Sequence, residues 1–324
     1  MKYQVAQHSL QGSRPINQDR VTYAERPNAV LMVLGDGLGG HVGGELASEL
    51  LTQVVLQDFN SVKQSTITNP SAFLALTILR AHRVIVSFGE SQNPPIQPRT
   101  TCVLCLIQNG YAYWAHVGDS RLYHFRGGQC LQRTIDHSSV EQMRQDGLIT
   151  EEEMLTHPSK GRLLKCLGGP RKPVISLSEE TLIQTNDLIL ICSDGLWEAL
   201  TLKDISDYIF SDNLEESVEE MLLDAEEQMQ KGSDNITAIC LKWADKITDH
   251  APLQANSILQ IDQDQIWHEA KNKILQNKVK KKRKAGKRKP KKSVKTKKTR
   301  GKKSDNIKQT IDELEAYISQ FETK

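Results

Sequence analysis

Acidic residues stand at the ends of apolar runs at five places in this 324-residue chain. Four belong to short motifs, and the fifth precedes a last apolar run: Asn17-Gln18-Asp19, Gly35-Asp36-Gly37, Gly118-Asp119-Ser120, Ser193-Asp194-Gly195 and Asp234-Asn235. A carboxylate at the end of a strand is well placed for a site, because the following turn lifts it out of the core. Five such carboxylates, spread over more than 200 residues, predict convergence on one site for a hard, oxygen-preferring cation.

The apolar runs beside these motifs predict short, buried β-strands. The runs that are too apolar and too short for surface helices are Ala29–Leu34, Tyr111–Val117 and Leu188–Cys192. We expect Thr101–Ile107, Tyr111–Val117 and Arg121–Phe125 to form a meander, with a tight hairpin at Asn109-Gly110. Since strands joined by hairpins pair antiparallel, antiparallel sheets with outer helices are favoured over a doubly wound fold.

Three longer segments predict helices that cover these sheets. Apolar residues recur at helical spacing in Gly44–Phe59, Pro70–Ser87 and Leu214–Met229, the last with a strongly acidic outer face. We expect no stretch to have the apolar length that spans a bilayer, and the N-terminal residues lack the apolar segment of a signal peptide. The sequence therefore predicts a cytoplasmic protein that is not transmembrane.

The six cysteines lie mostly in apolar, strand-like runs. This position is typical of reduced, buried thiols and indicates a reducing compartment. Cys102 and Cys105 have the spacing of a metal knuckle. However, an odd spacing on a strand sends the two side chains to opposite faces, and no second pair follows. A structural role is favoured for both.

The near-neutral charge of the whole chain hides two opposite parts. Residues 1–245 carry 20 Lys and Arg against 31 Asp and Glu, a net charge of −11, whereas residues 278–303 hold 17 basic residues and no acidic one. A segment this rich in lysine cannot bury a core, so we expect residues 278–303 to be a disordered tail. Residues 246–277 are expected to be a linker with a helical segment, and residues 304–324 an amphipathic helix.

The glycine-rich stretch from Gly35 to Gly40 also matches a dinucleotide-binding fingerprint. It follows a predicted strand and precedes a predicted helix, and Asp58 lies about twenty residues further on. However, Asp36 within the loop would set a carboxylate near the pyrophosphate, where neutral amides and a positive helix end are needed. The other strand-end aspartates would then have no role, so this alternative is disfavoured.

Six motifs follow one another along residues 1–243 in a defined order. They are Arg14-Pro-Ile-Asn-Gln-Asp19, Gly35-Asp-Gly-Leu-Gly-Gly-His-Val-Gly-Gly-Glu45, Val117-Gly-Asp-Ser-Arg121, Asp136-His-Ser138, Cys192-Ser-Asp-Gly-Leu-Trp197 and Gly232-Ser-Asp-Asn-Ile-Thr237. Together they resemble the ordered motifs of metal-dependent protein phosphatases of type 2C, in particular the bacterial-type members. Several degenerate motifs in the right order are far more specific than any one of them.

The resemblance implies a fold, a cofactor and a reaction. The expected fold is α+β, a four-layer α-β-β-α sandwich of two antiparallel sheets flanked by helices over residues 1–245, with a flap at about 137–182. The expected cofactor is Mn²⁺ or Mg²⁺, with two ions in the core site and room for a third. The expected reaction is hydrolysis of phosphoserine and phosphothreonine in proteins by a metal-bridging hydroxide, without a covalent enzyme intermediate.

The resemblance also implies the metal ligands, position by position. Asp36 would contact both ions, and Gly37 would offer its backbone carbonyl to one of them. Asp194 and Asp234 would complete the protein ligands of the other ion. Such water-rich coordination suits Mg²⁺ and Mn²⁺, which keep several waters when bound to protein.

Further positions match supporting roles. Asp19 would hold the water shell of the metals, and Asp119 matches the position that helps hold a third, weaker ion in bacterial-type members. Arg14 matches the phosphate-binding arginine, whose planar fork suits two phosphate oxygens. His41 is a candidate catalytic acid for the leaving group, although eukaryotic-type members place a histidine nearer the Asp-Gly pair. Gln18 stands where many members have a glutamate that can contact a metal.

The expected substrates are phosphorylated proteins, on which a monomeric enzyme would oppose a Ser/Thr kinase. The basic tail predicts an anionic partner, which is nucleic acid, lipid or an acidic protein. Two alternatives remain: a catalytically weak protein that binds phosphoproteins, or a nucleic-acid-associated scaffold that uses the tail. The retained aspartates disfavour the first. The tail has no aromatic residues to stack bases, so nucleic-acid binding would be nonspecific.

Overall fold

The computed structural model of the chain describes residues 1–39, 42–229 and 232–245. His41 and the expected linker, Lys-rich tail and terminal helix (246–324) lie outside the described residues. The expectations for these segments therefore stay predictions.

The described strands form two sheets in which all pairings are antiparallel. The first, called the β1 sheet, contains in spatial order β1 (Tyr3–Leu10), β11 (Ile236–Trp243), β10 (Leu188–Cys192), β6 (Arg121–Arg126) and β7 (Gln129–Arg133). The second, called the β3 sheet, contains β2 (Asp19–Arg26), β3 (Ala29–Asp36), β4 (Cys102–Gln108), β5 (Tyr111–Val117) and β8 (Ser176–Leu177), and β9 (Thr181–Leu182) also pairs with β5. The antiparallel sheets expected from the sequence are confirmed.

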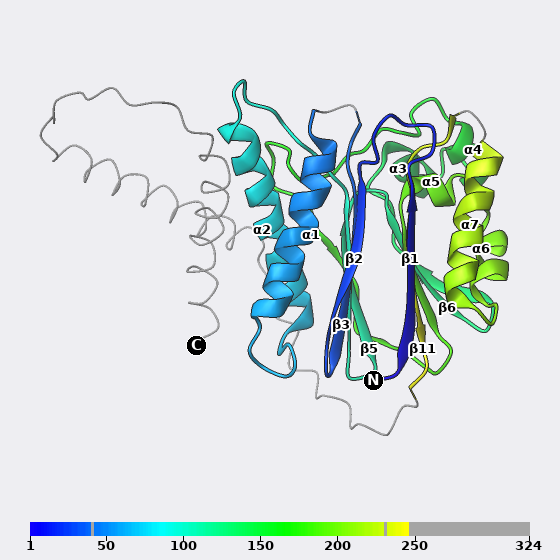
Figure 1. Ribbon diagram of the computed structural model, residues 1–324. Helices are drawn as coiled ribbons and strands as arrows, with labels where there is room; N and C mark the ends of the chain where they lie inside the picture. Colours follow the sequence, from blue (N-terminus) through cyan, green and yellow to red (C-terminus); the bar gives the residue numbers. More distant parts are fainter. Residues whose placement is uncertain (40–41, 230–231, 246–324) are drawn as a thin grey trace, which may run out of the picture. The chain divides into compact units, whose positions relative to one another are not determined.

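Helices lie on the outer side of each sheet (Figure 1). Two helices contact each other and the β3 sheet: α1 (Gly44–Ser61) and α2 (Pro70–Ser91). Three contact the β1 sheet: α5 (Asp194–Trp197), α6 (Leu202–Ile209) and α7 (Leu214–Met229). The connection from β7 to β8 contains α3 (Ser139–Gln145) and α4 (Glu151–Thr156). The three long helices predicted from the sequence are present, and α7 has the predicted bounds.

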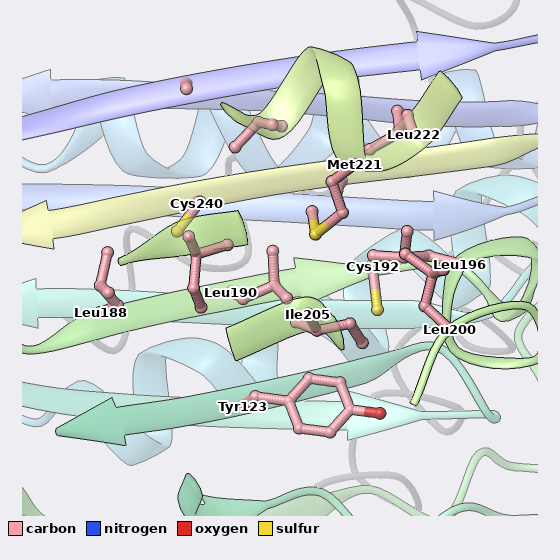
Figure 2. Packing of buried hydrophobic residues seen from close by; sticks show 14 of the residues in the cluster. Tyr123, Leu188, Leu190, Cys192, Leu196, Leu200, Ile205, Met221, Leu222 and Cys240 are labelled. Carbon is pink, nitrogen blue, oxygen red and sulfur yellow. The ribbon is translucent and has the colours of Figure 1, made fainter. Parts of the chain in front are cut away.

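Alternate residues of the central strands pack into two different cores. One core lies between the β1 sheet and its helices and includes Leu188, Leu190, Cys192, Met221, Leu222 and Cys240 (Figure 2). The other lies between the two sheets and includes Val30, Met32, Cys105, Ile189, Ile191 and Ile239. Strands covered on both faces need apolar residues at successive positions, which is why these runs show no polar alternation. Cys102 is buried but lies outside the inter-sheet core that contains Cys105, as their odd spacing predicts.

The predicted meander is wrong at its third strand. The hairpin between β4 and β5 is present, with φ of 54° at Asn109 and 79° at Gly110, as a two-residue turn requires. However, β6 leaves the β3 sheet and pairs with β10 and β7 in the β1 sheet. The crossing follows from Gly118, whose φ of +117° lets the chain change direction after β5. This crossing places Asp119 in the turn that connects the two sheets.

The expectation that no segment has the length and apolarity of a membrane span is wrong for α2. Among the described residues, α2 alone passes that test by length and composition, with a mean hydropathy of 1.4. Yet 61% of its apolar window is buried within the fold, and Arg80 forms an ion pair with Asp58 of α1. Packing against α1, β4 and β5 accounts for the apolar residues of α2.

Candidate active site

Two of the predicted aspartates face each other across neighbouring strands. Asp19 begins β2 and Asp36 ends β3, and the two are register partners in the antiparallel pair. Thr101, just before β4, holds Asp36 from the other side. The Thr101 N–H donates to Asp36 O at 2.8 Å, and the Asp36 N–H donates to Thr101 Oγ1 at 3.0 Å. Strand pairing therefore places both carboxylates at one edge of the β3 sheet.

Two more aspartates come from the ends of adjacent strands in the β1 sheet. Asp194 follows β10 as the first residue of α5, and Asp234 stands two residues before β11. Because β10 and β11 pair antiparallel, the end of one and the start of the other lie at the same edge. Gly195 allows the backbone after Asp194 to approach the backbone after Asp234 closely, since a Cβ at position 195 would lie 2.2 Å from the Asn235 carbonyl oxygen.

The fifth aspartate lies in the turn where the chain crosses from β5 to β6. Asp119 is 6% exposed, and its carbonyl accepts a hydrogen bond from Trp197 Nε1 at 3.1 Å. Arg121 stacks on the Trp197 ring at 3.5 Å and donates to both carboxylate oxygens of Asp136. These contacts hold the turn against α5, so that Asp119 lies near Asp194.

The five aspartates form an acidic cluster in which burial and neighbouring carboxylates raise the pKa of Asp19, Asp36, Asp119 and Asp194. Burial, followed by repulsion from Asp19 and Asp194, raises the pKa of Asp36 well above its ordinary value. Burial and repulsion from Asp119 do the same to the pKa of Asp194. Burial, together with Asp136, raises the pKa of Asp119 to about 7. Carboxylates that repel one another in this way have a strong preference for a bound cation.

The carboxylate of Asp19 indicates whether a metal ion fits the acidic cluster. Burial raises its pKa to about 6, although the nearby Ser193 and Thr237 hydroxyls lower it. Both Asp19 oxygens are nevertheless buried without a hydrogen bond of normal geometry to any described residue. The two hydroxyls are partly engaged elsewhere, since Ser193 Oγ accepts from the Thr237 N–H at 3.0 Å and Thr237 Oγ1 lies 2.7 Å from Ser9 Oγ. A hard cation and its water shell would satisfy these oxygens, so the residues fit the group.

In the part of the chain that the structure describes, no group of three or more His, Cys, Asp or Glu side chains is placed so that together they could hold a metal ion. The acidic cluster is therefore not a full protein cage of the kind that holds a structural metal. Mg²⁺ and Mn²⁺ accept such sites, since they bind through one or two carboxylates and keep several waters.

Arg14 lies at the rim of the acidic cluster. Its Nη2 donates to Asp234 Oδ2 at 2.6 Å, and the side chain is 54% exposed. Its Nη1 lies near the glycine loop: the distance from Arg14 Nη1 to the position that a Cβ would take on Gly39 is 4.0 Å. The hydrogen bond and charge of Asp234 raise the Arg14 pKa, and Asp194 and Asp36 add to this effect. A partly exposed cation beside the carboxylates can be reached by a phosphate group.

The glycine loop after β3 is held against Gln18. The Gly37 N–H donates to Gln18 O at 3.2 Å, and a Cβ on Gly37 would meet Gly44 O at 2.4 Å. Gln18 Nε2 in turn donates to Glu45 Oε2 at 3.3 Å. The amide at position 18 is thus linked to a carboxylate at the start of α1. The role of the Gly37 carbonyl as a metal ligand stays a prediction, and His41 lies outside the described residues.

Asn235 is a site residue to which the sequence alone assigned no role. Its Nδ2 donates to Gln11 O at 2.8 Å and to Ile16 O at 3.2 Å, and its Oδ1 accepts from the Gln18 N–H at 2.8 Å. One side chain therefore fixes the loop that carries Arg14 to the start of β11. In the sequence, the position of Asn235 directly after Asp234 was the signal that could have identified it as a site residue.

Comparisons with known proteins agree with this geometry. The model of the protein phosphatase 2C family matches residues 6–231. Serine/threonine phosphatase Stp of Listeria monocytogenes is 28% identical over 225 residues, which cover 68% of this chain and 87% of that protein. Protein phosphatase PhpP of Streptococcus pneumoniae is 31% identical over 201 residues, which cover 61% of this chain and 80% of that protein.

Solved structures show the same similarity. The S. agalactiae serine/threonine phosphatase has a TM-score of 0.69 at 27% identity and covers 75% of this chain and all of its own. The catalytic domain of the phosphatase PstP, in complex with two manganese ions, has a TM-score of 0.65 at 26% identity and covers 75% of this chain and 99% of its own. The chain therefore belongs to the protein phosphatase 2C family and is a metal-dependent protein serine/threonine phosphatase.

Proposed function

We propose that this phosphatase hydrolyses phosphoserine and phosphothreonine in proteins with two Mn²⁺ or Mg²⁺ ions held by the acidic cluster. The observation that carries the proposal is the buried carboxylate of Asp19, which lies opposite Asp36 and whose oxygens have no hydrogen-bond partner within the described part of the chain. Two ions bound here would supply a water of lowered pKa as the nucleophile. Asp36 would contact both ions, the Gly37 carbonyl one of them, and Asp194 and Asp234 the other.

The remaining residues would orient the reactants around that centre. Asp19 would hold the water shell of the metals, and Asp119 would help hold a third, weaker ion. Arg14 would bind the phosphate through the part of its fork that Asp234 leaves exposed. Burial raises the pKa of the Cys102 and Cys192 thiols, which keeps them protonated and poor nucleophiles. Direct attack by water, without a covalent enzyme intermediate, fits these features.

A single assay tests this mechanism class. Hydrolysis of a phosphothreonine peptide should proceed with Mn²⁺ or Mg²⁺ and stop when a chelator is present in excess. Turnover that persists unchanged in the chelator would contradict the proposed metal chemistry while leaving the family assignment intact.

Arg14→Ala should reduce kcat/KM for the phosphopeptide by about a hundredfold. The loss corresponds to about 3 kcal/mol, the size expected when charge-assisted hydrogen bonds to a phosphate are removed. Arg14→Lys should recover only part of it, since an ammonium lacks the planar fork. Steady-state kinetics at saturating Mn²⁺ check this, with Lys203→Ala as the charge control, because Lys203 is 84% exposed on α6 and pairs only with Asp207 among the described residues. An Arg14→Ala enzyme as active as Lys203→Ala would exclude phosphate binding by Arg14.

We further propose that residues 1–245 form a four-layer catalytic domain that acts as a cytoplasmic monomer against a Ser/Thr kinase. The basic tail would direct this domain to an anionic partner, which is nucleic acid, lipid or an acidic protein. The position of the tail supports this division, because the last matched motif ends at Thr237 and the Lys-rich block begins at Lys278.

Truncation after Asp249 should leave phosphopeptide turnover within about twofold of the full chain, because the acidic cluster lies wholly within residues 1–245 and exposed electrostatic effects are small at physiological salt. The same truncation should abolish salt-sensitive retention on heparin or on anionic vesicles. Kinetics and binding are measured on both proteins at two salt concentrations. A stably folded truncated protein without peptide turnover would refute the separation of catalysis from targeting.

A further inference from the structure

His137 holds the glycine that directly precedes Asp119. Its backbone N–H donates to Gly118 O at 2.8 Å, and its ring Nδ1 accepts from the Gly118 N–H at 3.2 Å. Only glycine fits at this turn, because its φ is +117° and a Cβ there would lie 2.7 Å from the Thr101 side chain. Both backbone polar groups of this turn residue therefore depend on His137.

The same histidine also binds two separate segments of the flap (about 137–182). Its carbonyl accepts from the Leu164 N–H at 2.8 Å, and its Nε2 lies 2.9 Å from Ser176 Oγ. Because Nδ1 accepts a hydrogen bond, the neutral ring carries its proton on Nε2, which donates to Ser176. Ser176 belongs to β8, where it is the register partner of His116 on β5.

The ring is held in one orientation by its surroundings. His137 is 7% exposed and stacks on His116, with ring centroids 4.6 Å apart and planes 17° from parallel. Burial, followed by the neighbouring His116, lowers the pKa of His137 to about 3. The ring is therefore neutral near pH 7, and its two nitrogens keep distinct roles as acceptor and donor.

We propose that His137 is a positioning residue that couples the flap to the Asp119 turn. Its Nδ1 sets the direction in which the chain leaves Gly118, and so the place of the Asp119 carboxylate. Its Nε2 ties the same ring to β8, so a displacement of the flap reaches Asp119 through one rigid side chain. His137 touches neither substrate nor metal in this scheme. The inference rests on the proposed role of Asp119 in holding a third ion.

Two substitutions separate the two ring contacts. His137→Asn keeps an acceptor near the place of Nδ1 and loses the contact with Ser176, whereas His137→Gln keeps a donor near the place of Nε2 and loses the acceptor for Gly118. Ser176→Ala removes the Nε2 contact while it leaves the ring in place. All three are made in the full chain and compared by thermal melting before kinetics.

His137→Gln should lower kcat by about tenfold and raise the Mn²⁺ concentration for half-maximal turnover by about tenfold, with KM for the phosphothreonine peptide within about twofold. These are the losses typical when a residue that orients a metal ligand is removed. His137→Asn should restore both values to within about threefold of the wild type. In the Asp119→Ala background, His137→Gln should cause no further loss, because both changes act on the same carboxylate.

Hydrogen exchange supplies a readout that does not depend on turnover. Mn²⁺ should protect the amides of residues 118–120 and of the flap segment 164–176 in the wild type. In Ser176→Ala the protection at 118–120 should remain and that around residue 176 should be lost, whereas the Leu164 amide keeps its hydrogen bond to the His137 carbonyl. Ser176→Ala therefore tests whether His137 couples the flap to the Asp119 turn even if His137→Gln does not fold.

Three results would overturn the coupling role: an unchanged Mn²⁺ response in folded His137→Gln, an undiminished loss in the Asp119→Ala background, or unchanged flap protection in Ser176→Ala. A failure of the proposed metal chemistry itself would look different, because wild-type turnover would then not depend on Mn²⁺ at all.

Discussion

Replacing Asp36 with Asn should lower Mn²⁺-dependent turnover of a phosphopeptide by at least about a thousandfold. Asp36 lies at the centre of the acidic cluster, opposite Asp19 and with Asp194, Asp119 and Asp234 near enough to raise its pKa. An amide of the same shape cannot supply the charge that two cations require, and each factor of ten in rate corresponds to about 1.4 kcal/mol. Steady-state kinetics with excess Mn²⁺ measure the loss.

The control for this variant is Asp207→Asn, which removes a carboxylate that is 67% exposed on α6 and paired with Lys203. It should retain full turnover. Normal activity in a folded Asp36→Asn protein would refute the assignment of Asp36 as the residue shared by two ions.

For the same Asp36→Asn variant, which should lose activity, we expect a gain in the stability of the metal-free protein. Because the folded pKa values of Asp36, Asp19 and Asp119 are raised, the folded chain binds protons more readily than the unfolded chain. Its free energy of unfolding should therefore fall as the pH rises from about 4 to about 7 in chelator. Asp36→Asn should make the chelated protein more stable at pH 7, and thermal melting in chelator measures both effects. A lower melting temperature would contradict the repulsion within the cluster.

Replacing Asp119 with Ala should remove most activity, about a hundredfold, while the two-ion centre survives. Asp119 comes from the β5–β6 turn and is fixed by Trp197, whereas Asp36, Asp194 and Asp234 come from strand ends at other places in the sheets. Loss of Asp119 should therefore leave Asp36, the proposed shared ligand, and its partners in position. Effects of this size are typical when an outer metal contact is removed.

Calorimetric titration of Asp119→Ala with Mn²⁺ checks this separation. Tight binding should persist at the wild-type level, while the Mn²⁺ concentration needed for full turnover should rise. Loss of all tight binding would show that Asp119 belongs to the same centre as Asp36, and that no weaker ion is held separately.

The sequence was sufficient to identify the acidic residues and most of the elements that carry them. Strands fully covered on both faces show runs of successive apolar residues, so Tyr111–Val117 and Leu188–Cys192 could be located with their final bounds. The carboxylates of Asp36, Asp119 and Asp194 stood out because each stands at or just after the end of such an apolar run. These are local properties, which a single chain displays without knowledge of its partners.

Contacts between distant segments could not be predicted in the same way. The turn at Gly118 sends β6 to the opposite sheet, although its sequence looks like the third strand of a meander. Asn235 braces the Arg14 loop from more than 200 residues away, and His137 reaches both Gly118 and Ser176. Apolar periodicity specifies that a face is buried, not against which element it is buried.

The sequence by itself determined which residues could bind a hard cation and that they belong to a phosphatase of this family. Only the tertiary structure decided that Asp19 pairs in register with Asp36 and that its buried oxygens have no protein hydrogen-bond partner among the described residues. It also decided that Arg14 lies against Asp234. The physical reason is that residue type sets what a carboxylate can bind, whereas its pKa and its partners depend on the charges and burial that folding places around it.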